Sequence, residues 1–196
     1  KFAIVNQRFW KMVEINDRRL PVGIQSFEVI RKDGYLYVDK TDIIWQLANR
    51  DKKYNYLSRP RRFGKSVLVD TLEAYFLGKK ELFEGLKIMQ METEWVKRPV
   101  IRLDMSRAGA EPDTLRSYLD ITFDRLEKEY GITPKPTAKL ADRFNAIIVG
   151  AYEQTGQQVA ILIDEYDSPL QHSWKTPQHE ACTAVYREVF AILKAD

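Results

Sequence analysis

The sequence predicts an α/β fold in which helices cover both faces of a parallel sheet. Strand-like and helix-like patterns alternate in the order strand, helix, strand, two helices, strand, helix, and this alternation is typical of parallel sheets. The run Val159-Ala160-Ile161-Leu162-Ile163 contains no polar residue, as expected of a strand buried on both faces. With 196 residues, the chain is long enough for one substantial domain with its own core.

Composition narrows the class of protein. The chain is 44% hydrophobic and 30% charged, and its net charge of +3 is too small to require nucleic acid as a partner. No apolar stretch approaches the length of a membrane span, and the first residues do not resemble a secretory signal. The single cysteine, Cys182, excludes an internal disulfide framework and fits a reducing compartment. We therefore expect a cytoplasmic protein without a membrane partner.

The first fifty residues combine an arm with short helices. Residues 1–19 carry apolar side chains that fit neither a helical nor a strand period, so we expect an N-terminal arm outside a domain at 20–196. Residues 26–32 are predicted to form a short helix, although the pair Asp33-Gly34 is also compatible with a hairpin turn. Thr41 is predicted to cap the helix that follows.

A phosphate-binding pattern lies between a predicted strand at 54–58 and a predicted helix. The segment 59–66 fits G-x-x-x-x-G-K-[ST], except that Arg59 stands at the first glycine. Pro60 pushes Arg59 toward extended geometry, so this loop is expected to enter its turn differently. The helix is predicted to end at Gly78. Its apolar face consists of Leu68, Leu72, Tyr75 and Phe76.

Each residue type in this pattern suits phosphate chemistry. Unpaired N–H groups at a helix start, together with the helix dipole, attract an anion. Gly64 lets the backbone approach phosphate, Lys65 reaches the β- and γ-oxygens, and Ser66 offers its hydroxyl to Mg²⁺. The predicted nucleotide-binding residues are Arg62, Phe63, Gly64, Lys65, Ser66 and Val67.

A second motif follows the apolar strand, which ends in Asp164 and Glu165. Ligands of open α/β sheets bind at the carboxyl ends of the strands. There Asp164 can hold Mg²⁺, directly or through water, opposite Ser66, and Glu165 can orient or deprotonate an attacking water. Taken alone, the pair also fits a solvated strand end, or a helix cap at Asp164. With the phosphate loop it predicts a P-loop NTPase that binds ATP and Mg²⁺, with Lys65 and Glu165 as catalytic residues.

The remaining elements complete the alternation. A strand is predicted at 98–104, and its last residue, Asp104, either faces the site or caps a turn. Helices are predicted at 113–130 and around Phe144, and another runs to the end of the chain, where no cap follows. We therefore expect a fragment whose sheet is truncated at the C-terminus. The last helix has an apolar stripe, and because Cys182 belongs to it we expect this cysteine to be a core residue. The stripe consists of Cys182, Val185, Tyr186, Val189, Phe190 and Leu193.

Six segments recur in one family of proteins, namely 20–27, 34–41, 58–66, 73–76, 79–86 and 162–169. In order and in sequence they resemble the predicted AAA-ATPase-like proteins of bacteria, in which Arg at the position of Arg59 is usual. The resemblance implies a P-loop ATPase with a glutamate beside the Mg²⁺ aspartate. Residues 64–66 match its phosphate loop, and 164–165 match its second motif. Longer members continue into another strand with a polar sensing residue and often into a nuclease-like domain.

Aromatic and basic residues admit other interpretations. Tyr54 and Tyr56 are interleaved with basic side chains, as in a nucleic-acid-binding patch, although the tyrosines are expected to pack in the sheet. Tyr35 and Tyr37 could pack against adenine, but core packing is the better interpretation. The basic residues of the patch are Lys52, Lys53, Arg59, Arg61, Arg62 and Lys65.

Other metal sites are less compatible with the sequence. Asp164, Glu165 and Asp167 could suggest a two-metal nuclease, but no basic residue follows at a fitting spacing. His172 and His179 have no spacing typical of zinc ligands. The preferred hypothesis is Mg-ATP binding and hydrolysis coupled to an unknown partner or effector domain. The alternatives are a nucleotide-dependent switch with little turnover and a nucleic-acid-binding component of a nuclease system, and self-association is compatible with each of them.

Overall fold

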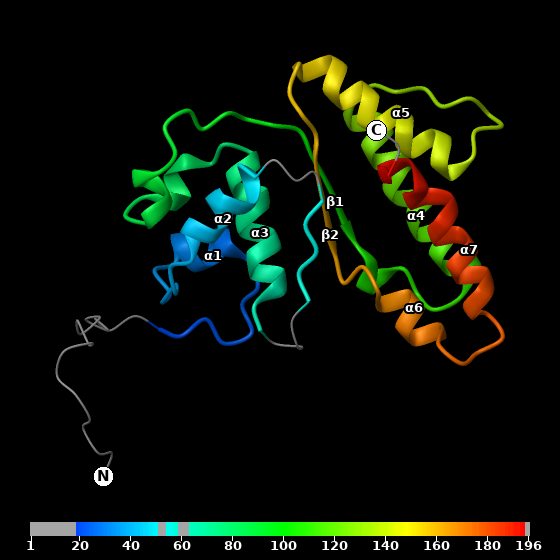
Figure 1. Ribbon diagram of the computed structural model, residues 1–196, viewed down its shortest axis with the longest axis horizontal. Helices are drawn as coiled ribbons and strands as arrows, with labels where there is room; N and C mark the ends of the chain where they lie inside the picture. Colours follow the sequence, from blue (N-terminus) through cyan, green and yellow to red (C-terminus); the bar gives the residue numbers. More distant parts are fainter. Residues whose placement is uncertain (1–18, 51–53, 59–62, 195–196) are drawn as a thin grey trace, which may run out of the picture.

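A two-stranded parallel sheet stands at the centre of the computed structural model, which describes residues 19–50, 54–58 and 63–194 (Figure 1). Strand β1 (Val100–Asp104) pairs with β2 (Ala160–Asp164), in register from Val100 opposite Ala160 to Asp104 opposite Asp164. In Figure 1, α1, α2 and α3 lie on one side of the sheet, and α4, α5 and α7 lie on the other. The predicted α/β class with helices on both sides of a parallel sheet is confirmed.

The larger helical layer is formed by α4 (Pro112–Glu129), α5 (Leu140–Thr155) and α7 (His179–Phe190), which pack pairwise against one another. Because side chains alternate along a strand, every second residue of β1 points into this layer. All three helices were predicted from their apolar spacing, and Cys182 is a buried core residue as expected. Buried members of this core include Ile101, Leu103, Leu119, Phe123, Phe144, Cys182 and Val185.

The smaller layer contains α1 (Phe27–Lys32), α2 (Thr41–Ala48) and α3 (Lys65–Phe76), with the 3-10 turns η1 (Lys80–Phe83) and η2 (Lys87–Gln90). As predicted, α3 follows Gly64 and stops just before Gly78, which has φ of 68°. The buried side chains of this layer include Phe27, Ile44, Ala74, Phe83 and Ile88.

Arg102 of β1 connects the sheet to the smaller layer. Its guanidinium forms an ion pair at 2.7 Å with Asp70 of α3 and a second one with Glu73 of the same helix. The other oxygen of Asp70 accepts a hydrogen bond at 2.6 Å from the backbone N–H of Phe27. These contacts hold α3 against the sheet and so determine where the first turn of α3 lies.

Short elements follow each strand and the last helix. They are η3 (Met105–Arg107) after β1, α6 (Ser168–Ser173) after β2 and η4 (Ala191–Lys194) after α7. Among the described residues, no helix combines the length and the apolar character needed to cross a membrane.

The predicted strand at 54–58 is not formed. None of the backbone hydrogen bonds of the described residues joins this segment to another strand, and Tyr56 is 77% exposed. The Tyr54 hydroxyl instead donates to the carbonyl of Leu193 in η4. A strand forms only where a neighbour accepts its backbone hydrogen bonds, and in the described chain β2 has β1 as its sheet partner. For the same reason Ala160–Ile163 are half-buried rather than fully buried.

Two smaller predictions can be compared with the structure, and the one for Thr41 is wrong. Thr41 is the first residue of α2 rather than its cap. Its backbone N–H and its hydroxyl both donate to Asp39, at 2.9 and 2.7 Å, so the carboxylate caps the helix instead. Of the two readings near Asp33, the helix is the one formed, since α1 ends there and no hairpin follows within the described residues. Residues 1–18 of the predicted arm lie outside the described residues.

Candidate functional site

The two sequence motifs meet at one edge of the sheet. The first turn of α3 and the carboxyl end of β2 lie at the same end of the molecule in Figure 1, and α3 packs against β2. The Lys65 ammonium lies 3.5 Å from the Glu165 carboxylate. Two residues from motifs far apart in sequence are therefore brought within ion-pair distance, as a shared site requires.

Gly64 begins α3 in a conformation that favours glycine. Its φ and ψ are 72° and 25°, in the left-handed region, and among the described residues no side chain caps the helix at this position. A Cβ at Gly64 would meet no atom within 4 Å, so the backbone angle rather than crowding explains the glycine. Within the part of the chain that the structure describes, the first N–H groups of α3 are therefore open to an anion.

Of the other predicted nucleotide-binding residues, the structure describes Phe63, Ser66 and Val67. Phe63 is 64% exposed, and Ser66 is half-buried in the first turn of α3. Val67 is also half-buried, and its carbonyl accepts a hydrogen bond at 2.7 Å from the Thr71 hydroxyl. Arg62 lies outside the described residues, as do Arg59, Pro60 and Arg61.

Glu165 has an unusual backbone conformation. Its φ is 49°, in the left-handed region that residues with a Cβ rarely adopt. Its N–H donates to Asp164 Oδ1 at 3.0 Å, and its carbonyl accepts from the N–H of Ser168 at 2.9 Å. These bonds turn the chain directly after β2, so that the Glu165 side chain reaches Lys65. The two side chains are 33% and 22% exposed, respectively.

Asp164 and Ser66 supply oxygen ligands of the kind that Mg²⁺ prefers. Asp164 is only 7% exposed, and within the described residues one N–H, that of Glu165, donates to its carboxylate. A buried carboxylate with so few donors is costly unless a cation or water lies beside it. The chemistry of these two oxygen groups therefore fits a magnesium ion.

The competing metal sites are not assembled in the part of the chain that the structure describes. No group of three or more His, Cys, Asp or Glu side chains there could hold a metal ion. Asp167 instead accepts a hydrogen bond from Gln171. His172 and His179 contact different serines, Ser168 and Ser173.

Asp104, opposite Asp164 in the sheet, serves a turn. Its carboxylate accepts from the N–H and hydroxyl of Ser106 at 3.2 and 2.6 Å and lies 3.5 Å from Arg107. This is the turn role that the sequence left open. Tyr37 packs edge-on against Phe27 at 5.0 Å in the core of the smaller layer, as core packing predicts.

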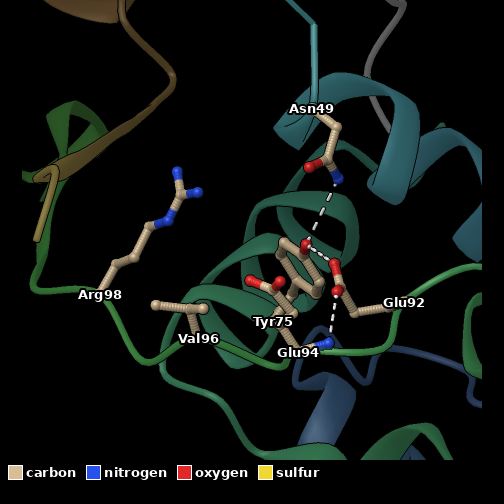
Figure 2. A pocket seen from close by; sticks show the side chains of 6 residues that line it. All are labelled: Asn49, Tyr75, Glu92, Glu94, Val96 and Arg98. Carbon is tan, nitrogen blue, oxygen red and sulfur yellow. Dashed lines mark hydrogen bonds between the residues drawn. The ribbon is translucent and has the colours of Figure 1, made fainter.

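A small pocket lies at the opposite end of α3 from Lys65 (Figure 2). Tyr75, near the end of that helix, accepts a hydrogen bond from Asn49 at 3.4 Å and donates to Glu92. Burial, reinforced by the Glu92 carboxylate, raises the pKa of Tyr75 to about 12. The residues that line the pocket are Asn49, Tyr75, Glu92, Glu94, Val96 and Arg98. This small pocket lies near the C-terminal end of α3 and is separate from the Lys65 site.

One hydrogen bond beside the site was not predicted from the sequence. The hydroxyl of Tyr186, on α7, donates to the carbonyl of Tyr166 at 2.7 Å, directly after Glu165. The helical stripe placed Tyr186 in the core but did not indicate a partner for its hydroxyl. The available signal was chemical, because a buried tyrosine hydroxyl nearly always finds a hydrogen-bond acceptor.

The chain is similar to a described protein family over most of its length. The family described as Predicted AAA-ATPase matches residues 21–196. A protein of Azotobacter chroococcum mcd 1, described as an uncharacterized protein in the vnfD 5′ region, is 38% identical over 165 residues, which are 82% of this chain and 31% of that protein. The chain thus spans about a third of the length of this relative. No solved structure matches the chain significantly. The chain belongs to the predicted AAA-ATPase family.

Proposed function

We propose that this chain is the core of a P-loop ATPase that binds and hydrolyses Mg-ATP in the cytoplasm, coupled to a partner or effector domain. The observation that carries the proposal is the position of Lys65, in the first turn of α3 and 3.5 Å from Glu165. Membership of the predicted AAA-ATPase family supports nucleotide binding in general. The left-handed Gly64 supports an anion site at the same helix start.

Each residue has a distinct role in this proposal. Lys65 and the N–H groups of the first turn of α3 bind the β- and γ-phosphates and stabilise the charge that shifts onto the leaving group. Ser66 and Asp164 would hold Mg²⁺, whose charge neutralises the phosphate oxygens when it is bound. Glu165 orients an attacking water and accepts its proton.

A nucleotide-dependent switch with little turnover is the second candidate. It is favoured by the Lys65–Glu165 ion pair, because a carboxylate held by the lysine is not free to activate water. In this alternative, phosphate binding exchanges the partner of Lys65 and moves the loop after β2, while hydrolysis is slow. Nucleic-acid binding and self-association remain further proposals, and neither follows from the contacts of the described residues.

Steady-state phosphate release separates hydrolysis from a switch. Wild type is compared with Asp164→Asn and with Asp113→Asn, a matched change at an exposed position of α4. Hydrolysis predicts multiple turnovers by wild type and by the Asp113 variant, and a loss of about 10²-fold or more in the Asp164 variant. Saturable Mg-ATP binding without multiple turnovers would favour the switch. Turnover that Asp164→Asn leaves intact would refute the role of this site.

A further inference from the structure

The backbone of Glu165 is held in a conformation that it would not adopt alone. A left-handed φ of 49° is unfavourable for a residue with a Cβ and persists where surrounding contacts determine it. Two of these contacts are local, namely the hydrogen bonds with Asp164 and Ser168. Both lie within the same short turn, so they cannot fix the turn relative to the rest of the protein.

The contact that fixes the turn comes from α7. Tyr186 is 5% exposed, and its hydroxyl donates at 2.7 Å to the carbonyl of Tyr166, the residue after Glu165. The ring of Tyr166 packs edge-on against Tyr186 at 5.4 Å and against Phe190 at 5.3 Å. A single helix thus holds both the backbone and the side chain of the residue next to Glu165.

The same part of the chain also reaches the segment before the phosphate loop. The Tyr54 hydroxyl donates to the carbonyl of Leu193 in η4, and η4 directly continues α7. The helix with its 3-10 extension therefore contacts both segments that lead into the candidate site. This arrangement suits an element that aligns the two segments.

We infer that Tyr186 is a positioning residue for Glu165. Through the Tyr166 carbonyl it holds the turn after β2 in the left-handed conformation that directs the Glu165 carboxylate toward Lys65. The inference rests on the proposed function, because the role of Glu165 in activating water belongs to that proposal. In the described part of the chain Tyr186 forms no hydrogen bond with Lys65 or Glu165, and it acts through the backbone of the turn.

Tyr186→Phe tests the inference, because it removes the hydroxyl and keeps the ring packing. Tyr75→Phe is the matched control, since it also removes a hydrogen-bonded hydroxyl, but near the C-terminal end of α3. Three quantities are measured on each purified protein, namely Mg-ATP affinity by calorimetry, phosphate release, and hydrogen exchange of the amides of Glu165 and Ser168. The exchange measurement does not depend on activity and reports the turn itself.

The expected result for Tyr186→Phe is unchanged Mg-ATP affinity, with turnover reduced about three- to tenfold and faster exchange of both amides by a similar factor. Tyr75→Phe should change neither turnover nor exchange. If wild type turns over ATP and Tyr186→Phe matches it in rate and exchange, the positioning role is refuted while the proposed function stands. If wild type neither binds nor hydrolyses ATP, the proposed function fails, and the role of Tyr186 in catalysis fails with it.

Discussion

The ion pair between Lys65 and Glu165 makes a quantitative prediction for Glu165→Gln. The two side chains are separated by 3.5 Å and are partly exposed, so their attraction is worth about 0.5–1 kcal/mol. Bound phosphate needs the same ammonium group and must compete with the carboxylate for it. Removing the negative charge should therefore strengthen Mg-ATP binding by about two- to fivefold, the factor that corresponds to this free energy.

The same substitution should nearly abolish hydrolysis. An amide cannot accept a proton from the attacking water, and loss of a general base typically costs about 10²–10⁴ in rate. Affinity and turnover should thus change in opposite directions. A merely disruptive mutation would weaken both, which makes this combination diagnostic.

Calorimetric titration and phosphate release measure the two effects. Glu153→Gln, at an exposed position of α5, controls for the change in net charge. The increase in affinity should shrink as salt is added, because salt screens partly exposed charges. Weaker binding by Glu165→Gln, or an equal increase in the Glu153 variant, would refute competition for Lys65. Full turnover by Glu165→Gln would refute its catalytic role.

Three further predictions concern the fold. Arg102→Met removes the ion pairs that join β1 to α3. Because these groups are partly exposed, the free energy of unfolding measured by urea titration should fall by about 1–2 kcal/mol. An unchanged free energy of unfolding would mean that packing alone holds α3. Gly85→Ala should lower stability by about 1 kcal/mol, because residue 85 has a left-handed backbone. Gly109→Ala should lower stability more, since its Cβ would also overlap Thr114. The reverse order of stabilities in thermal denaturation would contradict this geometry. Burial and Glu92 raise the pKa of Tyr75 from 10.0 to about 12, so the protonated hydroxyl stabilises the folded state below pH 10 and this stability is lost as the pH rises to about 12. Tyr75→Phe should therefore lose less stability than wild type between pH 10 and pH 12. Parallel curves of unfolding free energy against pH for the two proteins would contradict the raised pKa.

The helices could be predicted because their spacing directly reports burial. The stripe that contains Cys182 and the repeat that contains Phe144 are both buried at every turn, since a helix with one apolar face has one stable way to lie on a core. The end of α3 at Phe76 was also predictable within two residues. Gly78 has the left-handed φ that ends α3.

The strand at 54–58 could not be predicted in the same way, because a strand depends on a neighbour that the local sequence does not specify. The residues of the site were proposed from Gly64-Lys65-Ser66 and from Asp164-Glu165, and the structure brings Lys65 and Glu165 together. The left-handed backbone of Glu165 and its support by Tyr186 were not predictable. They depend on a carbonyl and a hydroxyl from distant segments, and neither group has a sequence signature.

The most direct test of the proposed site is a calorimetric titration of the purified protein with ATP in the presence of Mg²⁺. It is made for wild type, for Lys65→Ala and for Lys128→Ala, which removes an exposed lysine of α4. The proposed site predicts saturable binding by wild type and by the Lys128 variant, and loss of binding by Lys65→Ala. Equal binding by all three proteins, or binding by none of them, would contradict a nucleotide site at the first turn of α3.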